Sequence, residues 1–186
     1  FVEGAARLGV SMKSLRRNTS GCKGASRCNF GCPHGAKMSV DVSMLPKARA
    51  HGAVIVSDAL VEKIDVERGV ARGVRGRFID PRTGEPGVRF EVRARVVVVA
   101  CGSLHTPVLL RKSGLGATHV GKNLTLHPAF RVGAGFDDRV DGWDGAMQSV
   151  YSDHFASEGL TLVGMYPAPS VLAAAFPGGG REHRRA

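Results

Sequence analysis

The stretch VVVVACGSLHTPVLLRKSGLGATHVGKNLTLH, from Val96 to His127, carries the main prediction about the fold of this chain. Its first residues, Val96–Ala100, are continuously apolar, which is typical of a parallel strand buried on both faces. Cys101-Gly102-Ser103 then supplies small residues for a tight turn. We therefore expect a buried strand that ends in a turn, which is where doubly wound α/β folds bind ligands.

A short helix is predicted after this turn. Thr106 is a good N-cap residue, and Pro107 suits the first helical position because an N–H there has no helical partner. Ser113-Gly114 is expected to end the helix. A strand, a turn of small residues and a helix in this order present backbone N–H groups that can bind phosphate.

The same residues match a known pattern at every fixed position. GSLHTPVLLRKSGLG, Gly102–Gly116, resembles the second signature of the glucose–methanol–choline (GMC) oxidoreductases, and VGKNLTLHP, Val120–Pro128, is similar to the segment that follows it there. The resemblance implies a flavoprotein that oxidises alcohols, as an oxidase or a dehydrogenase. In such enzymes a histidine base removes the hydroxyl proton of a CH–OH group, and hydride passes to FAD.

The resemblance also implies a fold class and a division into domains. The expected class is α/β: a partial Rossmann-like FAD/NAD(P)-binding domain with an antiparallel β-meander, plus the start of an α+β substrate domain. Residues 1–128 would form the FAD-binding domain without the GxGxxG unit with which the family begins, and residues 129–186 the beginning of the substrate-binding domain. The family's enzymes are several times longer, so the sequence resembles the middle of one and is expected to be inactive alone.

Cofactor contacts are the site residues that the resemblance implies here. Val61, within ALVEKI, corresponds to a residue whose backbone pairs with the adenine edge. The other implied contacts lie at the turn and the helix start: Ala100, Cys101, Gly102, Ser103, Thr106 and Pro107. No catalytic residue and no metal ligand is assigned in this chain. His127 is interpreted as a satisfied structural histidine, because it does not hold the motif position of the base.

Apolar periodicity predicts the remaining elements. Residues 1–8 should be the end of a helix closed by Gly9, and Val40–Ala48 a core helix that Pro46 kinks or splits. Strands at 60–66, 70–79 and 88–92 should form a three-stranded antiparallel meander, with turns at 68–69 and 80–84. Further strands are expected at 53–56, 130–136, 146–151 and 160–165, and an exposed loop at 177–186.

Three cysteines share one Gly- and Ser-rich loop, at Cys22, Cys28 and Cys32. Their spacing contains no CxxC pair, which argues against a tetrahedral zinc site. An iron–sulfur cluster, a disulfide and reduced thiols packed in the loop all stay open, and we favour reduced thiols without a metal. The loop also resembles a cysteine segment of some GMC members, of which certain sugar dehydrogenases carry a cluster.

The formal net charge of +10 invites a nucleic-acid interpretation, but its distribution argues against one. Residues 1–50 hold nine Lys/Arg against two Asp/Glu, while the rest of the chain holds seventeen against fourteen. Only 6% of the residues are aromatic, too few for a base-stacking surface. We therefore expect FAD and a small-molecule alcohol as partners, and no nucleic acid; the sequence does not indicate the electron acceptor.

No apolar run reaches the length of a transmembrane helix. No signal peptide is visible, which favours the cytoplasm, although the N-terminus looks incomplete. Two other functions stay open at this point. One is a truncated, non-catalytic polypeptide, and the other is an iron–sulfur-bearing sugar or polyol dehydrogenase subunit.

Overall fold

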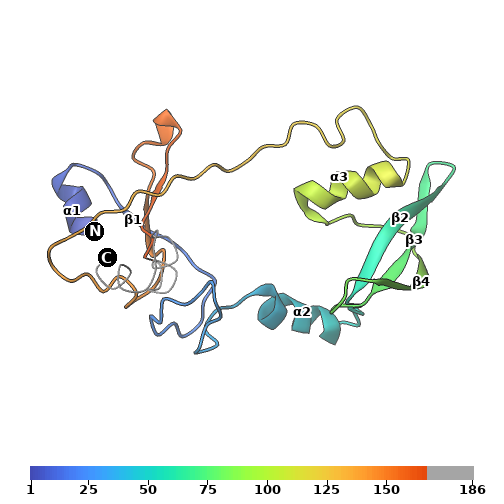
Figure 1. The fold of residues 1–186 in the computed structure, drawn as a ribbon, viewed down its shortest axis with the longest axis horizontal. Coiled ribbons are helices and arrows are strands. Elements are labelled where there is room, and N and C mark those ends of the chain that lie inside the picture. Colours follow the sequence, from blue (N-terminus) through green and yellow to red (C-terminus); the bar gives the residue numbers. More distant parts are fainter. Residues whose placement is uncertain (167–186) are drawn as a thin grey trace. The chain divides into compact units, whose positions relative to one another are not determined.

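The computed structural model describes residues 1–166, which divide into two compact units (Figure 1). One unit comprises Phe1–Ala53 together with the segment from Gly133 onward, and the other comprises Val54–Val132. Each contains helices and antiparallel strands, so the chain is of mixed α/β class. The loop expected at 177–186 lies outside the described residues.

The centre of the unit 54–132 is a three-stranded meander. β2 (Ala59–Glu67), β3 (Val70–Ile79) and β4 (Pro86–Arg93) pair antiparallel in chain order, which confirms the prediction. The β2–β3 turn places Arg68 at φ +50° and Gly69 at φ +78°. Two successive positive φ angles give the turn a twist that matches the twist of the strands it joins.

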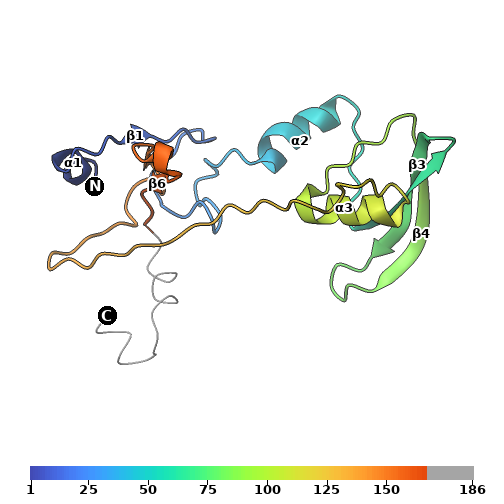
Figure 2. The same ribbon diagram turned by 90° about the horizontal axis from the view of Figure 1, so that it is seen from above.

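Helix α3 (Gly102–Lys112) lies beside β2 (Figures 1 and 2). Ser113 fastens the two together, because its hydroxyl accepts a hydrogen bond from the Ile64 backbone N–H at 2.8 Å and donates one to the Leu109 carbonyl at 2.7 Å. The side chains of Ile64 and Leu109 are buried and form the small core at this contact. Ser113 also ends the helix, with Gly114 at φ +77°, as predicted.

The predicted start of this helix, with Thr106 as N-cap and Pro107 at the first position, is wrong. α3 begins at Gly102, directly after Cys101, and Pro107 lies inside it. Gly102 has φ +75°, a value that glycine adopts without steric cost, and this lets the chain enter the helix several residues earlier. Pro107 then leaves the Ser103 carbonyl without its usual helical donor, which costs one hydrogen bond.

The expected buried strand at Val96–Ala100 is not formed within residues 1–166. Val96 is 74% exposed and Val98 is 83% exposed. Both sheets of the described chain are antiparallel, so no parallel neighbour supplies the N–H and C=O groups that this run would need. The strands expected at 53–56 and 130–136 are absent for the same reason: no described strand runs alongside either one.

Two helices belong to the other unit. α1 (Val2–Arg7) is followed by Gly9 at φ +72°, as predicted. α2 (Val40–Ala50) is continuous through Pro46, so the prediction of a split is wrong; the proline removes only one helical N–H. No residue of α2 is buried, so the prediction of a core helix is wrong as well, because nothing in its own unit covers its apolar side chains.

A second small antiparallel sheet lies in this unit. β5 (Val150–Ser152) is its middle strand and pairs with both β1 (Lys13–Ser14) and β6 (Leu162–Val163). A single 3₁₀ turn, η1 (Ala156–Glu158), connects β5 to β6. The strands expected at 146–151 and 160–165 are thus present but shorter, and β1 was not predicted because two residues carry no readable alternation.

Candidate functional site

The turn that leads into α3 is open to solvent. Ala100, Cys101, Gly102 and Ser103 are all exposed, and no side chain caps the first N–H groups of the helix. A methyl group added at Gly102 would meet nothing within 4 Å. The start of α3 therefore offers unpaired backbone donors, together with the positive end of the helix dipole, to an anionic group.

Thr106 and Pro107 are half-buried, one turn further along α3. Pro107 faces the loop that follows the helix, since a Cβ added at Gly121 would lie 3.5 Å from its own Cβ. Gly121 has φ +75° and so favours glycine for its backbone as well. In this structure, therefore, Pro107 supports the loop, whereas the turn itself faces solvent.

Val61 lies half-buried on β2, opposite Gly76 of β3. The pairing register shifts directly after it, so that Glu62 is the extra residue of a bulge. Within the described residues, no hydrogen bond joins Val61 to the turn at 100–103. Both predicted contacts lie in one unit, in which α3 is bonded to β2 through Ser113, at the end of the helix opposite the turn.

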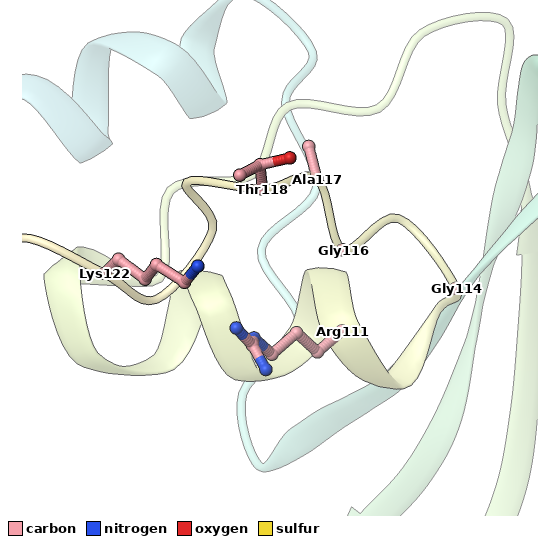
Figure 3. Close-up of a pocket in the computed structure, with 6 residues that line it drawn as sticks. All are labelled: Arg111, Gly114, Gly116, Ala117, Thr118 and Lys122. Carbon is pink, nitrogen blue, oxygen red and sulfur yellow. The ribbon is translucent and has the colours of Figure 1, made fainter.

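An open pocket of about 530 Å³ lies between α3 and the loop after it (Figure 3). Its lining consists of Arg111, Gly114, Gly116, Ala117, Thr118 and Lys122. Arg111 shapes the pocket: its Nε and Nη2 both donate to the Val120 carbonyl, at 3.1 and 2.8 Å, and so hold the loop against the helix. The lining thus contains two cationic side chains and no acidic one, and the guanidinium of Arg111 is already bonded to the loop.

Sequence reasoning missed Arg111 and Lys122. Both occupy free positions of the GMC-like pattern, where the pattern gives no signal. One feature of the sequence could have indicated this pocket. A basic residue in the last turn of a helix is followed by a Gly-rich loop that contains a second basic residue. Such a helix end attracts cations through its free carbonyls and its dipole.

The cysteine loop lies where it was predicted, outside the regular elements. Cys22 is exposed, while Cys28 and Cys32 are half-buried, and all are free thiols. No group of three or more metal-ligating side chains is close enough to hold an ion anywhere in residues 1–166. The metal-free state of the loop stays a prediction, since an assembled cluster would itself order these side chains.

His127 is not the satisfied structural histidine that we expected. It is exposed, and none of its atoms takes part in a hydrogen bond within the described residues. The cause is the extended path of residues 123–136, which pack against no sheet. A separate finding concerns membranes: none of the helices in residues 1–166 is long and apolar enough to cross one.

Comparison with known proteins gives consistent matches. The sequence model of a family described as GMC oxidoreductase matches residues 1–129. An uncharacterised GMC-type oxidoreductase of Mycobacterium tuberculosis is 41% identical over 184 residues, which covers 98% of this chain and 28% of that protein. A second one, from Sinorhizobium fredii, is 42% identical over 138 residues, covering 74% of this chain and 27% of the relative.

Relatives with named activities are more distant. A long-chain-alcohol oxidase of Arabidopsis thaliana is 33% identical over 151 residues, covering 78% of this chain and 20% of that enzyme. The 2-methyl-1,2-propanediol dehydrogenase of Mycolicibacterium austroafricanum is 35% identical over 137 residues, or 67% of this chain and 24% of the relative. This chain thus spans between 20% and 28% of the length of these relatives.

Proposed function

Because this chain belongs to the GMC oxidoreductase family, we propose that the protein of which it is part oxidises an alcohol with FAD as its redox cofactor. The observation that carries the proposal is the family match over residues 1–129, which includes the uncapped, solvent-open helix start at Gly102. FAD, when bound, would accept the hydride that leaves the carbinol carbon. The role of this chain's residues is to hold the cofactor in place.

The proposed domain division follows from the same resemblance. Residues 1–128 would belong to a Rossmann-like FAD-binding domain, and residues 129–186 to the beginning of the substrate-binding domain. Cofactor contacts are proposed for the backbone of Val61 and for the turn and helix start: Ala100, Cys101, Gly102, Ser103, Thr106 and Pro107. Catalysis is assigned to none of the residues in this chain.

The chemistry of the donor set fits a dinucleotide. A pyrophosphate carries negative charge and takes backbone N–H donors, and the start of α3 presents such donors without a competing side-chain cap. Val61 offers a backbone beside a β-bulge, where an N–H or C=O is released from the ladder and can pair with a base edge. Neither contact requires a particular side chain.

We propose an aliphatic alcohol as the substrate class. The relatives with named activities comprise a long-chain-alcohol oxidase and a diol dehydrogenase, both of which act on alcohols. Their names suggest two kinds of substrate for this protein, an alcohol with a long alkyl chain or a short polyol. A panel of alcohols that differ in chain length and in hydroxyl number distinguishes the two.

The test uses the product of the complete gene. We expect it to purify with the two visible absorption bands of an oxidised flavin, and we expect anaerobic addition of the correct alcohol to bleach the longer-wavelength band. Catalytic turnover with oxygen, or only with an artificial acceptor, then distinguishes an oxidase from a dehydrogenase. A colourless protein that does not bind added FAD would contradict the proposal and favour a non-catalytic polypeptide.

A pair of glycine variants locates the cofactor. Gly102→Ala places a methyl group where φ is +75°, so it strains the start of α3 by about 1–2 kcal/mol. We expect FAD affinity to fall by about tenfold if the turn must keep its geometry to bind FAD. The control is Gly133→Ala, at a residue without positive φ and with no atom within 4 Å of the added carbon. Equal FAD retention in both variants would show that Gly102 does not contribute to FAD binding.

A further inference from the structure

The meander ends in a strand that is paired on one side only. β4 follows β3 in the sheet order β2–β3–β4, and within residues 1–166 nothing pairs with its other edge (Figure 1). None of the eight residues of β4 is buried. A free strand edge presents a row of backbone N–H and C=O groups, and a further strand can extend the sheet there.

The hydrogen-bonding direction along β4 follows from one bond at its end. Ala94 N–H donates to the Arg72 carbonyl at 2.9 Å, and the register continues without a shift as far as Arg77 opposite Arg89. Because the direction of the backbone groups alternates along a strand, the N–H and C=O of Arg89 and Glu91 face away from β3. These two residues therefore offer their backbone groups to a new strand.

The side chains of β4 alternate between an apolar face and a charged face. Phe90 lies on the apolar face, where its ring centre is 5.2 Å from that of Phe78. Val88 and Val92 share this face by alternation, and they are 76% and 53% exposed. The edge of the sheet thus carries apolar side chains that no part of residues 1–166 covers.

The sequence of this edge is complementary to itself when two copies run antiparallel. With Phe90 opposite Phe90 of the second copy, Arg89 of each copy lies opposite Glu91 of the other, which forms two ion pairs. On the apolar face, Val88 of each copy lies opposite Val92 of the other. The backbone direction agrees as well, because Arg89 and Glu91 are the residues that face outward and can exchange both hydrogen bonds.

Neighbouring registers do not have this match. Moving one copy by two residues places Glu91 opposite Glu91 in one direction, and Arg89 opposite Arg89 in the other. Like charges directly opposite each other destabilise a strand pair. A shift by one residue joins the charged face of one copy to the apolar face of the other. The charges and the alternation therefore select a single register.

We propose that β4 is a homodimer contact, in which two copies of the complete protein pair these strands antiparallel with Phe90 at the twofold axis. The contact joins two three-stranded meanders into one continuous sheet. The partner is a second copy of this chain, because the charges and the backbone direction of β4 match those of β4 itself. The proposal is independent of the alcohol oxidation, since none of the proposed cofactor contacts lies on β4.

Sedimentation velocity of the complete gene product tests the contact at micromolar concentrations, where we expect a dimer. Glu91→Arg and Arg89→Glu each replace both ion pairs by pairs of like charge, so each should raise the Kd of the dimer by about tenfold. Arg82→Glu is the matched control, because Arg82 is exposed in the turn before β4 and outside the contact. A monomeric parent protein, or a dimer of equal stability in all variants, would overturn the proposal.

Mixing the two variants tests the register itself. In a dimer that contains one copy of Glu91→Arg and one of Arg89→Glu, opposite charges face each other again at both positions. We therefore expect an equimolar mixture to form heterodimers with a Kd close to that of the parent, although each variant alone is largely monomeric. A mixture that associates no better than the separate variants would contradict the antiparallel register.

A cross-link provides a readout that does not depend on the charge variants. Phe90 of the two copies would form a non-hydrogen-bonded pair, whose Cα atoms lie about 4.5 Å apart, within the range that a disulfide spans. Oxidised Phe90→Cys should therefore give a dimer linked through tryptic peptide 90–93, which mass spectrometry identifies. Val88→Cys is the control, since Val88 faces Val92 and not its own equivalent. Equal cross-linking of both variants, or none in Phe90→Cys, would overturn the proposal.

Discussion

Ser113 shows how one residue connects two distant parts of the chain. Its hydroxyl accepts from Ile64 N–H and donates to the Leu109 carbonyl, and Ser113 and Ile64 are only 9% and 3% exposed. A buried N–H that loses its acceptor costs more than an average hydrogen bond is worth, because water cannot replace the partner. This one hydroxyl therefore determines how firmly α3 is attached to β2.

Ser113→Ala is expected to weaken this attachment by about 1–3 kcal/mol, the cost of a buried, unsatisfied N–H. The measurement is hydrogen exchange of the Ile64 amide in the intact protein, which should become faster by at least tenfold. Ser57→Ala serves as the control, since Ser57 lies in the same unit, is exposed and forms no side-chain hydrogen bond within the described residues. An unchanged Ile64 exchange rate would show that the bond contributes little.

Local residue chemistry predicted the end of α3 at Ser113 but not the bond to Ile64. A serine followed by a glycine is a local signal for a helix end. The bond to Ile64 joins residues 49 positions apart, and no pattern along the chain encodes that pairing. The same limit applies to Arg17 and Cys28, whose contact depends on how a loop folds back on itself.

Among the elements, the meander β2–β4 follows most closely from its sequence. The spacing of apolar residues predicted the three strands, and turn-forming residues predicted their boundaries. In one of these turns, Asp80 Oδ1 accepts hydrogen bonds from the N–H groups of Arg82 and Thr83, at 2.8 and 3.2 Å. Each of these signals lies within a few residues of its effect. The prediction of a strand at Val96–Ala100 was wrong because a parallel strand needs neighbouring strands, and these come from other parts of a chain.

Gly76 is one of two positions in β3, with Gly73, where the meander has no room for a side chain. A Cβ added there would lie 2.0 Å from the Leu60 carbonyl oxygen and 2.8 Å from Phe90 Cζ. Gly76→Ala should therefore destabilise the meander by about 1–3 kcal/mol, because the backbone of β2 must move.

Limited trypsin digestion checks this prediction, since the meander is rich in arginine and local opening exposes cleavage sites. Cleavage after Arg72, Arg75 and Arg77 should be faster in Gly76→Ala than in the parent protein. Gly87→Ala is the control within the same sheet, where the nearest atom to the added carbon, the Phe78 carbonyl oxygen, is 3.4 Å away. Equal digestion of both variants would mean that the strands adjust without cost.

Across the whole molecule, apolar surface exceeds what residues 1–166 can cover. Four hydrophobic side chains are buried, namely those of Ala36, Ile64, Leu109 and Met147. Runs that the sequence predicts as strands lie open, with Phe130 and Val132 exposed at 92% and 97%. Composition and periodicity predict that such residues belong in a core. They do not predict which segments cover them, because that depends on the packing of the complete fold.

The 186-residue polypeptide, expressed alone, is therefore expected neither to unfold cooperatively nor to bind FAD tightly. The four apolar side chains buried within residues 1–166 contribute too little to offset the loss of conformational entropy on folding. The proposed FAD contacts at Val61 and at 100–107 are also too few for a dinucleotide.

The measurements are urea unfolding, binding of the hydrophobic dye ANS, and titration of flavin fluorescence, with the complete gene product as reference. We expect strong ANS fluorescence, a broad transition and no saturation by micromolar FAD. A soluble monomer that unfolds sharply and binds FAD at micromolar or lower concentration would show that these residues build a sufficient core and cofactor site by themselves.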